Sequence, residues 1–411
     1  MPRPPLVDQL VAAFAEMPVI DCHEHLPPEH VRTSMKVDAF TLFCHYTHLD
    51  QNTAGLAEAD YQRIQNPDLP LEMRWPLFAP ILANIRYGSY ARPAFIAAKE
   101  FYGFDDINEE TYRPLSEAMQ AANTPGIYRR VLVEKCGIKA ALTQAGRTDY
   151  DDGLLIPLMP LDTYAGVGAW RDLAQRAAAI DEVPNSLDEY LETIREGLRK
   201  WKTENVVGLK MVSRTYGPPS RARAVELFEN LRNGSCESLP EMNPLRDFLM
   251  ESMLDLAAEE GLVVAVHTGM WGDFRTLDPQ HMIPIIQRHP ATRFDLYHAG
   301  MPWVRETGVI GKNFANVWLN LCWCHIISPK MTRSFLDEWL DLVPINKILA
   351  FGGDYGTPVE KVYGHLTMAR EDIATVLANR IDEGLLDLDD ALLIACKWFY
   401  ENPKELYGLT I

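Results

Sequence analysis

The chain alternates short apolar runs with longer amphipathic segments over most of its length. Eight apolar runs stand out, at residues 18–25, 138–145, 154–161, 206–212, 262–267, 293–298, 317–323 and 348–354. Near-continuous apolar runs of this length are typical of parallel strands that are covered on both faces. The run at 154–161 contains two prolines, and it is therefore the weakest of the eight strand predictions.

Helix-start signals lie between these runs. Ser186–Glu189 forms a capping box in front of a long amphipathic segment. Asn243-Pro244 opens another such segment, with proline at the first helical position, and Asp278-Pro279 and Ser328-Pro329 open two more. Eight strands that alternate with helices predict an α/β fold of the (β/α)8 TIM-barrel type.

Residues 27–133 do not follow this rhythm. They are rich in aromatic and helix-forming residues, and they separate the first two predicted strands. We predict a helical insertion here rather than a separate N-terminal domain, because the first strand of the barrel precedes this segment. The residues after Pro358 predict terminal helices that close the barrel. Residues 1–411 are thus expected to form a single barrel domain that carries the 27–133 insertion.

The composition excludes several classes of partner. The chain is 47% hydrophobic and 23% charged, which suits a large globular core. Its formal net charge of -18 argues against binding to nucleic acid or to anionic membranes, both of which need a basic surface. An anionic small substrate stays possible, because a pocket can be locally basic. We expect a small-molecule substrate and a homo-oligomer.

The seven cysteines form no disulfide framework, because their number is odd and their spacing is irregular. The closest pair, Cys322 and Cys324, is a C-x-C and not a redox or zinc-knuckle motif. Reduced thiols in a cytoplasmic protein are the simplest interpretation. We expect no signal peptide and no transmembrane helix, since the N-terminus lacks a long apolar region and no apolar stretch is long enough.

Side chains that can bind metals stand at the carboxyl ends of several predicted strands. They are His23, His25, Lys210, His267, His298 and Asp354. His23 and His25 are two residues apart, so both imidazoles point to the same side of a strand. Active sites of TIM barrels form at this end of the barrel. One such histidine alone is more often a buried structural residue, but the set predicts a divalent metal site, with zinc as the ion and manganese as the alternative.

The run VIDCHEHL, followed by Lys, His, His and Asp in that order, resembles the amidohydrolase superfamily. The C-terminal ENPKELYGL resembles the ending of its amidohydrolase-related (amidohydrolase 2) branch, which includes lactonases, decarboxylases and uronate-isomerase-like members. The resemblance covers nearly the whole barrel but not the insertion. It implies that His23, His25 and Asp354 bind a first metal, and that Asp354 is the base that moves a proton from water to the leaving group.

The resemblance also assigns roles to three further residues. His267 and His298 match the metal-ligating histidines of strands five and six, and His298 would orient or polarise the substrate if it binds no second metal. In binuclear members a carboxylated lysine bridges two ions, and Lys210 matches that position. Alternatively, Lys210 is an ordinary lysine that pairs with a substrate carboxylate or with Asp354. An unpaired ammonium inside an apolar strand is costly, so Lys210 is expected to have one of these roles. The choice between them leaves one or two ions possible.

Residues that select the substrate should come from the loops after the strands. The candidates are Arg147, Arg214, Tyr216, Trp271, Trp323 and His325. Either arginine could hold a carboxylate with two hydrogen bonds, and the tryptophans could wall the pocket. A solvated arginine or a tryptophan in the core is equally compatible with the sequence. Three insertion histidines, His30, His45 and His48, could cover the mouth without binding the metal.

We therefore predict a metal-dependent hydrolase that acts on a C–N or C–O bond of a small, carboxylated molecule. The first alternative is a non-oxidative decarboxylase, although those members often carry E-x-H where this chain has H-x-H. The second is a uronate-isomerase-like enzyme, which the tryptophan-rich seventh strand favours and Lys210 disfavours. A non-enzymatic binding protein would have no need of a water-activating acid such as Asp354.

Overall fold

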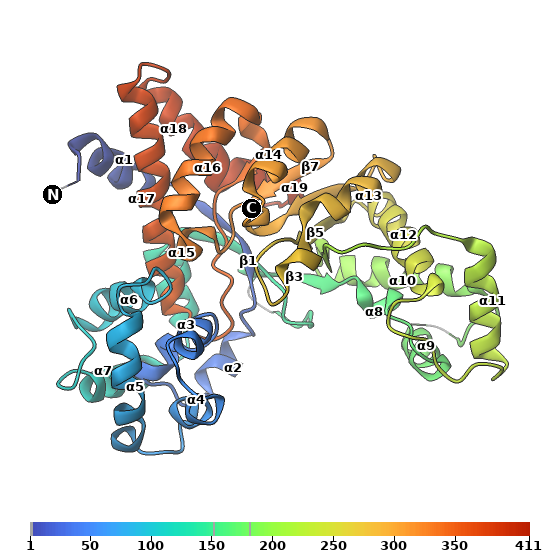
Figure 1. The fold of residues 1–411 in the computed structure, drawn as a ribbon, viewed down its shortest axis with the longest axis horizontal. Helices are drawn as coiled ribbons and strands as arrows, with labels where there is room; N and C mark the ends of the chain where they lie inside the picture. Colours follow the sequence, from blue (N-terminus) through green and yellow to red (C-terminus); the bar gives the residue numbers. More distant parts are fainter. Residues whose placement is uncertain (1–2, 151–152, 181) are drawn as a thin grey trace.

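A computed structural model describes residues 3–150, 153–180 and 182–411. Within these residues eight parallel strands form one sheet, in the order β1 to β8 (Figure 1). They are β1 (Val19–Glu24), β2 (Ile138–Thr143), β3 (Leu155–Pro160), β4 (Gly208–Val212), β5 (Val263–His267), β6 (Arg293–Leu296), β7 (Val317–Asn320) and β8 (Ile348–Leu349). The predicted (β/α)8 barrel is confirmed, including the doubtful third strand, which pairs with both of its neighbours.

The sheet curves back on itself between β1 and the segment after β8. The backbone N–H of Cys22 donates to the carbonyl oxygen of Phe351 at 3.0 Å, and the backbone N–H of Asp354 donates to the carbonyl oxygen of His23 at 2.8 Å. These bonds bring the end of β1 beside residue 354. The first strand and the segment after the last strand thus meet at the barrel mouth.

β8 and β6 are shorter than their apolar runs predict, since β8 ends at Leu349 and β6 at Leu296. For β8 the reason is that the following backbone groups find partners outside the ladder. The N–H of Ala350 donates to the carbonyl oxygen of Trp398 at 3.0 Å, and that of Gly353 donates to the Asp21 carboxylate at 3.1 Å.

Helices follow the strands around the barrel. They are α8 (Asp162–Ala165), α9 (Trp170–Ala178), α10 (Leu187–Thr203), α11 (Arg221–Arg232), α12 (Pro244–Glu259), α13 (Ile283–Arg288), α14 (Val304–Asn313), α15 (Cys324–Ile327) and α16 (Pro329–Leu342). The predicted helix starts hold: the Ser186 hydroxyl accepts from the N–H of Glu189, and the Asn243 side chain accepts from that of Arg246. These caps satisfy N–H groups that have no partner inside the helix.

The segment between β1 and β2 is helical, as expected. It contains α2 (Glu29–Thr33), η1 (Ala39–Phe43), α3 (Thr47–Thr53), α4 (Glu58–Gln65), α5 (Leu71–Ile85), α6 (Arg92–Tyr102), α7 (Tyr112–Ala122) and the π-helix η2 (Arg129–Lys135). Its buried side chains, among them Phe40, Trp75 and Phe78, form a hydrophobic cluster of their own. Figure 1 shows these helices in blue and cyan beside the barrel, with α6 close to the long helix α17 (Glu360–Asp382).

The remaining helices lie at the two ends of the chain. α1 (Pro5–Ala15) packs on α17 and on α18 (Leu388–Cys396), and the π-helix η7 (Lys397–Glu401) and α19 (Asn402–Tyr407) complete the C-terminal region. All seven cysteines are free thiols. None of the helices in the described parts of the chain combines the length and the apolar character that crossing a bilayer requires.

Candidate metal centre and active site

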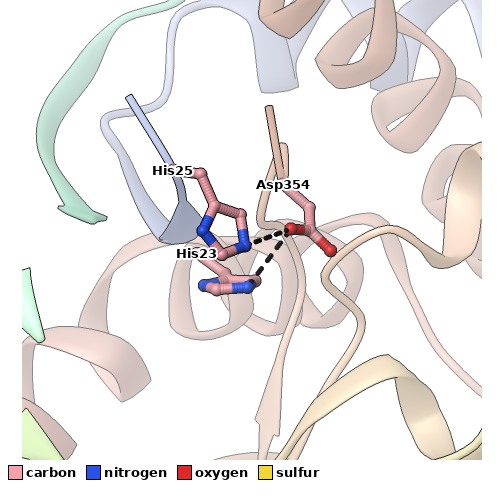
Figure 2. A group of neighbouring side chains, drawn as sticks. All are labelled: His23, His25 and Asp354. Atoms are coloured by element: carbon pink, nitrogen blue, oxygen red, sulfur yellow. Dashed lines mark ion pairs between the residues drawn. The ribbon is translucent and has the colours of Figure 1, made fainter. Parts of the chain in front are cut away.

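Three side chains converge at the mouth of the barrel (Figure 2). His23 lies in β1, His25 follows that strand directly, and Asp354 lies on the segment after β8. The Nε2 atoms of both histidines are 3.2 Å from Asp354 Oδ1. One ligand atom from each residue can be chosen so that all three lie within 4.8 Å of one another. His23 and Asp354 are buried, and His25 stands partly exposed at the rim.

The bonding state of these atoms fits a metal cation. Asp354 Oδ1 is buried and, among the described residues, has no hydrogen-bond partner, although two imidazole nitrogens approach it. His25 Nδ1 lies 2.8 Å from the carbonyl oxygen of Gln144, which can only accept a hydrogen bond. Nδ1 therefore carries a proton, and in the tautomer that this bond selects the lone pair lies on Nε2, which approaches Asp354. Imidazole lone pairs beside a carboxylate oxygen are the donor set of zinc and related ions.

Burial and local charge set the protonation of this cluster. Burial alone would raise the pKa of Asp354, but the imidazoles of His23 and His25 beside it outweigh burial and hold that pKa well below its ordinary value. Burial, helped by the Lys210 charge, lowers the pKa of His23 to about 3. The aspartate is therefore ionised and His23 is neutral near pH 7, which are the forms that bind a cation.

A second pair of histidines stands across β5 and β6. His298 Nδ1 lies 3.1 Å from the carbonyl oxygen of Cys322, and its Nε2 lies 3.0 Å from His267 Nδ1. Because a carbonyl only accepts, neutral His298 donates from Nδ1 and accepts at Nε2. His267 must then donate from Nδ1, which leaves a lone pair on its Nε2. That atom is buried and has no partner in the described parts of the chain, and His267 lines the cavity.

His298 itself does not line the cavity, and both of its ring nitrogens have protein partners. Its backbone adopts φ 64°, a left-handed conformation that is uncommon for residues other than glycine. This conformation follows the end of β6 and places the ring behind His267. The structure thus brings His298 to the site as a support for His267.

Lys210 reaches the same cluster from β4. Its Nζ lies 3.5 Å from His23 Nε2 and 3.6 Å from the centroid of the Tyr297 ring. Burial lowers the pKa of this lysine to about 8, against the opposing effect of nearby acidic groups. Within the described residues no ion pair joins Lys210 to Asp354, so that expected pairing is not seen.

The cluster opens into a cavity of about 600 Å³. Its lining residues are His23, His25, His45, Tyr46, Gln144, Pro160, Asp162, Lys210, Met211, Val212, His267, Trp271, Leu277 and Asp354. His45 and Tyr46 come from the insertion, so the insertion does cover the mouth. His45 has φ 61°, and its Nδ1 is buried without a partner. Burial lowers the pKa of His45 to about 4, so this ring is neutral near pH 7.

The sequence interpretation missed Tyr46, Gln144 and Asp162 as lining residues. Gln144 directly follows β2, and Asp162 is the second residue after β3. Both positions could have been found by the rule that identified His267, because each is a polar residue just beyond a strand. Tyr46 offered no such signal, since the insertion has no periodic relation to the barrel.

The two candidate arginines do not line the cavity. Arg147 is bound by Asp149 two residues away. Arg214 pairs with Glu241 at 3.3 Å, and its ring neighbour Tyr216 donates a hydrogen bond to the carbonyl oxygen of Val212 at 2.8 Å. Nearby partners therefore occupy the groups that were expected to hold a substrate carboxylate.

Of the four aromatic candidates, the structure brings Trp271 alone to the cavity wall. Trp323 is completely buried and stacks on Tyr46, with ring centroids 4.2 Å apart. His325 is also buried, at 3.1 Å from both Asp372 and the carbonyl oxygen of Ala350. Trp323 thus supports a lining residue, and His325 fixes the base of the segment that leads to Asp354.

Two buried acids beneath the site hold the segment that carries Asp354. Asp21 accepts hydrogen bonds from the N–H groups of His23 and Gly353, and Glu24 accepts one from that of Tyr355. Burial is the main cause that raises the pKa of Asp21 to about 6. A Cβ atom on Gly353 would lie 2.0 Å from a Glu24 carboxylate oxygen, so this close approach requires glycine.

Comparison with known proteins gives one family and several structural neighbours. A family model described as Amidohydrolase matches residues 168–409. The protein fluG of Emericella nidulans is 25% identical over 199 residues, which are 46% of this chain and 23% of that protein. The chain thus covers less than a quarter of that relative's length.

Two solved structures superpose on nearly the whole chain. The uronate isomerase of Thermotoga maritima gives a TM-score of 0.79 at 15% identity, over 98% of this chain and 97% of that one. The glucuronate isomerase of Caulobacter crescentus gives 0.78 at 18% identity, over 100% and 96%. At these identities the likeness demonstrates a common fold, which includes the helical insertion.

Proposed function

The chain belongs to the amidohydrolase family, and from this we propose that it is a metal-dependent hydrolase of a C–N or C–O bond in a small molecule. Family membership indicates an enzyme, and members of the family generally depend on a metal. The observation that carries the proposal is the approach of His23 and His25 to a single oxygen of Asp354, at 3.2 Å each.

His23, His25 and Asp354 would hold one divalent ion, with zinc favoured by the two imidazoles and manganese as the alternative. Such an ion acts as a Lewis acid, which polarises a substrate carbonyl and makes water more acidic. We propose one ion rather than two because of Lys210. Its Nζ lies over the face of Tyr297, a position that attracts an ammonium and would repel an anionic carbamate.

The protein's own groups would then move the proton and position the substrate. Asp354 is ionised and borders the cavity, so it can accept a proton from water and pass it to the leaving group. His267, whose Nε2 carries a lone pair, lines the same cavity and would add a further ligand to the ion. Lys210 is the one lysine or arginine among the described lining residues, and we propose that it contacts the carboxylate of the substrate.

A second candidate is an isomerase that acts on a sugar acid. It is favoured by the superposition with uronate isomerases over the whole chain, because this match includes the insertion that supplies His45 and Tyr46 to the cavity. Isomerisation would use the same proton-accepting groups but would consume no water.

Mass spectrometry separates the two reactions. We would incubate zinc-loaded protein in ¹⁸O-labelled water with a panel of N-acyl amino acids, lactones and uronates. Hydrolysis cleaves a bond and places one labelled oxygen in a product, whereas isomerisation leaves the mass of the product equal to that of the substrate. Asp354→Asn is the control, because it should abolish either activity. Turnover that survives in Asp354→Asn would refute the assignment of this carboxylate.

A further inference from the structure

A second cavity, of about 580 Å³, lies between the helical insertion and the barrel. One wall is formed by residues 86–96, which connect α5 to α6 and begin α6. The other wall is the turn from α15 into α16 together with the first residues of α16. The insertion wall lies outside the residues that match the family, so family membership gives this cavity no role.

Four cationic side chains line this second cavity: Arg86, Arg92, Lys330 and Arg333. Among the described residues of its lining none is acidic. The whole chain carries a net charge of -18, so the sign of the charge here is opposite to that of the molecule. A concave surface lined by one sign of charge concentrates counter-ions of the other sign.

The arginines are held in place but keep free donors. Each arginine has one acidic partner: Arg86 pairs through Nη2 with Asp106, Arg92 through Nη2 with Glu371 at 2.6 Å, and Arg333 through Nη1 with the buried Asp372 at 3.2 Å. A guanidinium has five N–H donors, so each arginine can still bind a ligand. Lys330 is exposed, and within the described chain it has no ion pair.

Besides the cations, the lining consists of apolar and aromatic side chains and two serines, Ser89 and Ser328. The guanidinium of Arg86 lies over the ring of Phe95, at 5.2 Å from the centroid, and Tyr87 is 88% exposed. Ile327 adds aliphatic surface from the barrel side. The Ser89 hydroxyl donates to the carbonyl oxygen of Ile327 at 3.1 Å, which fastens the two walls together.

We propose that this second cavity binds a small organic anion: a phosphate or carboxylate group among the four cations, and an aromatic or aliphatic body against Phe95 and Ile327. The guanidinium geometry suits a planar or tetrahedral oxyanion, and the exposed Tyr87 ring offers a surface on which an aromatic body packs. Bound there, the anion braces the insertion against the barrel.

The test is calorimetric titration of the zinc-loaded full chain with phenyl phosphate as the probe. We expect saturable binding at this cavity, at least about tenfold tighter than for phenol or for inorganic phosphate, because each lacks one half of the recognised chemistry. Lys330→Glu should weaken the binding by about tenfold or more. Arg86→Gln, which keeps the aliphatic part of the side chain and removes its charge, should also weaken it. Lys312→Glu is the matched control, since it reverses one exposed lysine on α14 and should leave the affinity unchanged.

Phenyl phosphate can also reach the catalytic cavity, so the titration is repeated with His25→Ala, where binding at the second cavity should persist. Three results would overturn the proposal. They are no saturable binding, binding that is lost in His25→Ala but retained in Lys330→Glu, and an equal loss in Lys330→Glu and Lys312→Glu. Thermal unfolding of each variant shows that it is folded, and because Lys330 and Lys312 are both exposed, neither change disturbs the core.

Discussion

Changing His298 to phenylalanine should weaken zinc binding by about 10- to 100-fold, the loss usual for a group that orients a metal-binding histidine. Phenylalanine fills the space of the imidazole, but it can neither accept the hydrogen bond from His267 Nδ1 nor donate one to the carbonyl oxygen of Cys322. Without zinc the His267 ring can turn until this donor finds another acceptor, but the zinc-binding orientation leaves the donor buried and unpaired, which costs about 1–3 kcal/mol. Since 1.4 kcal/mol corresponds to a factor of ten, both estimates give the same range.

Competition with a chromophoric zinc chelator measures this affinity without knowledge of the substrate. Thermal unfolding of the metal-free variants reports separately on any loss of fold stability. His298→Gln is the matched control, because its carboxamide oxygen can take the place of Nε2 as the acceptor for His267. We expect His298→Gln to retain most of the affinity. If His298→Phe binds zinc within about threefold of the parent protein, the inferred tautomers are refuted, because so small a loss lies below the range expected for an orienting group.

Three further predictions concern stability. Arg32→Met should lower the free energy of unfolding in denaturant by about 3–5 kcal/mol, because it leaves the buried Glu360 carboxylate without the cation that lies 2.9 Å away. The double variant Arg32→Met with Glu360→Leu should recover most of this loss, because no buried charge is then left unpaired. Burial lowers the pKa of His289, but two carboxylate partners outweigh burial and raise that pKa above its ordinary value. The stabilisation from these partners is therefore complete below about pH 6.5 and is lost as the pH rises through the folded-state pKa. This pH dependence should be absent from unfolding curves of His289→Gln. Gly353→Ala should lower the melting temperature sharply and Gly356→Ala should not, because an added Cβ meets a carboxylate oxygen at 2.0 Å in the first case and nothing closer than 3.9 Å in the second.

The fold could be predicted because its signals are local and repeated. Each strand is an apolar run, and several helices around the barrel begin with a capping side chain such as Ser186 or Asn243. Even 154–161 forms a strand, since a parallel ladder tolerates proline where its missing N–H is not needed. The rule that active sites form at the carboxyl ends of strands then located His23, His25 and Asp354, which the structure brings together.

The lining of the cavity was harder to predict, because it depends on competition between partners. Arg147 and Arg214 follow strands as expected, yet Asp149 and Glu241 lie close enough to bind them first. A sequence shows which charges exist but not which of them meet. Tyr46 was missed for a different reason, since nothing in the insertion indicates which of its residues reaches the barrel.

Main-chain oxygens decide how the site's histidines are used, and they carry no sequence signature at all. The carbonyl oxygen of Gln144 fixes the tautomer of His25, and that of Cys322 fixes the tautomer of His298. In both cases the identity of the residue is irrelevant, because any amino acid supplies the same acceptor. Residue types at strand ends therefore predict that a metal is bound, but the direction of each lone pair depends on the register of β2 and the turn after β7. For this reason His298 matches the ligand pattern in sequence and yet stands behind His267 in the structure.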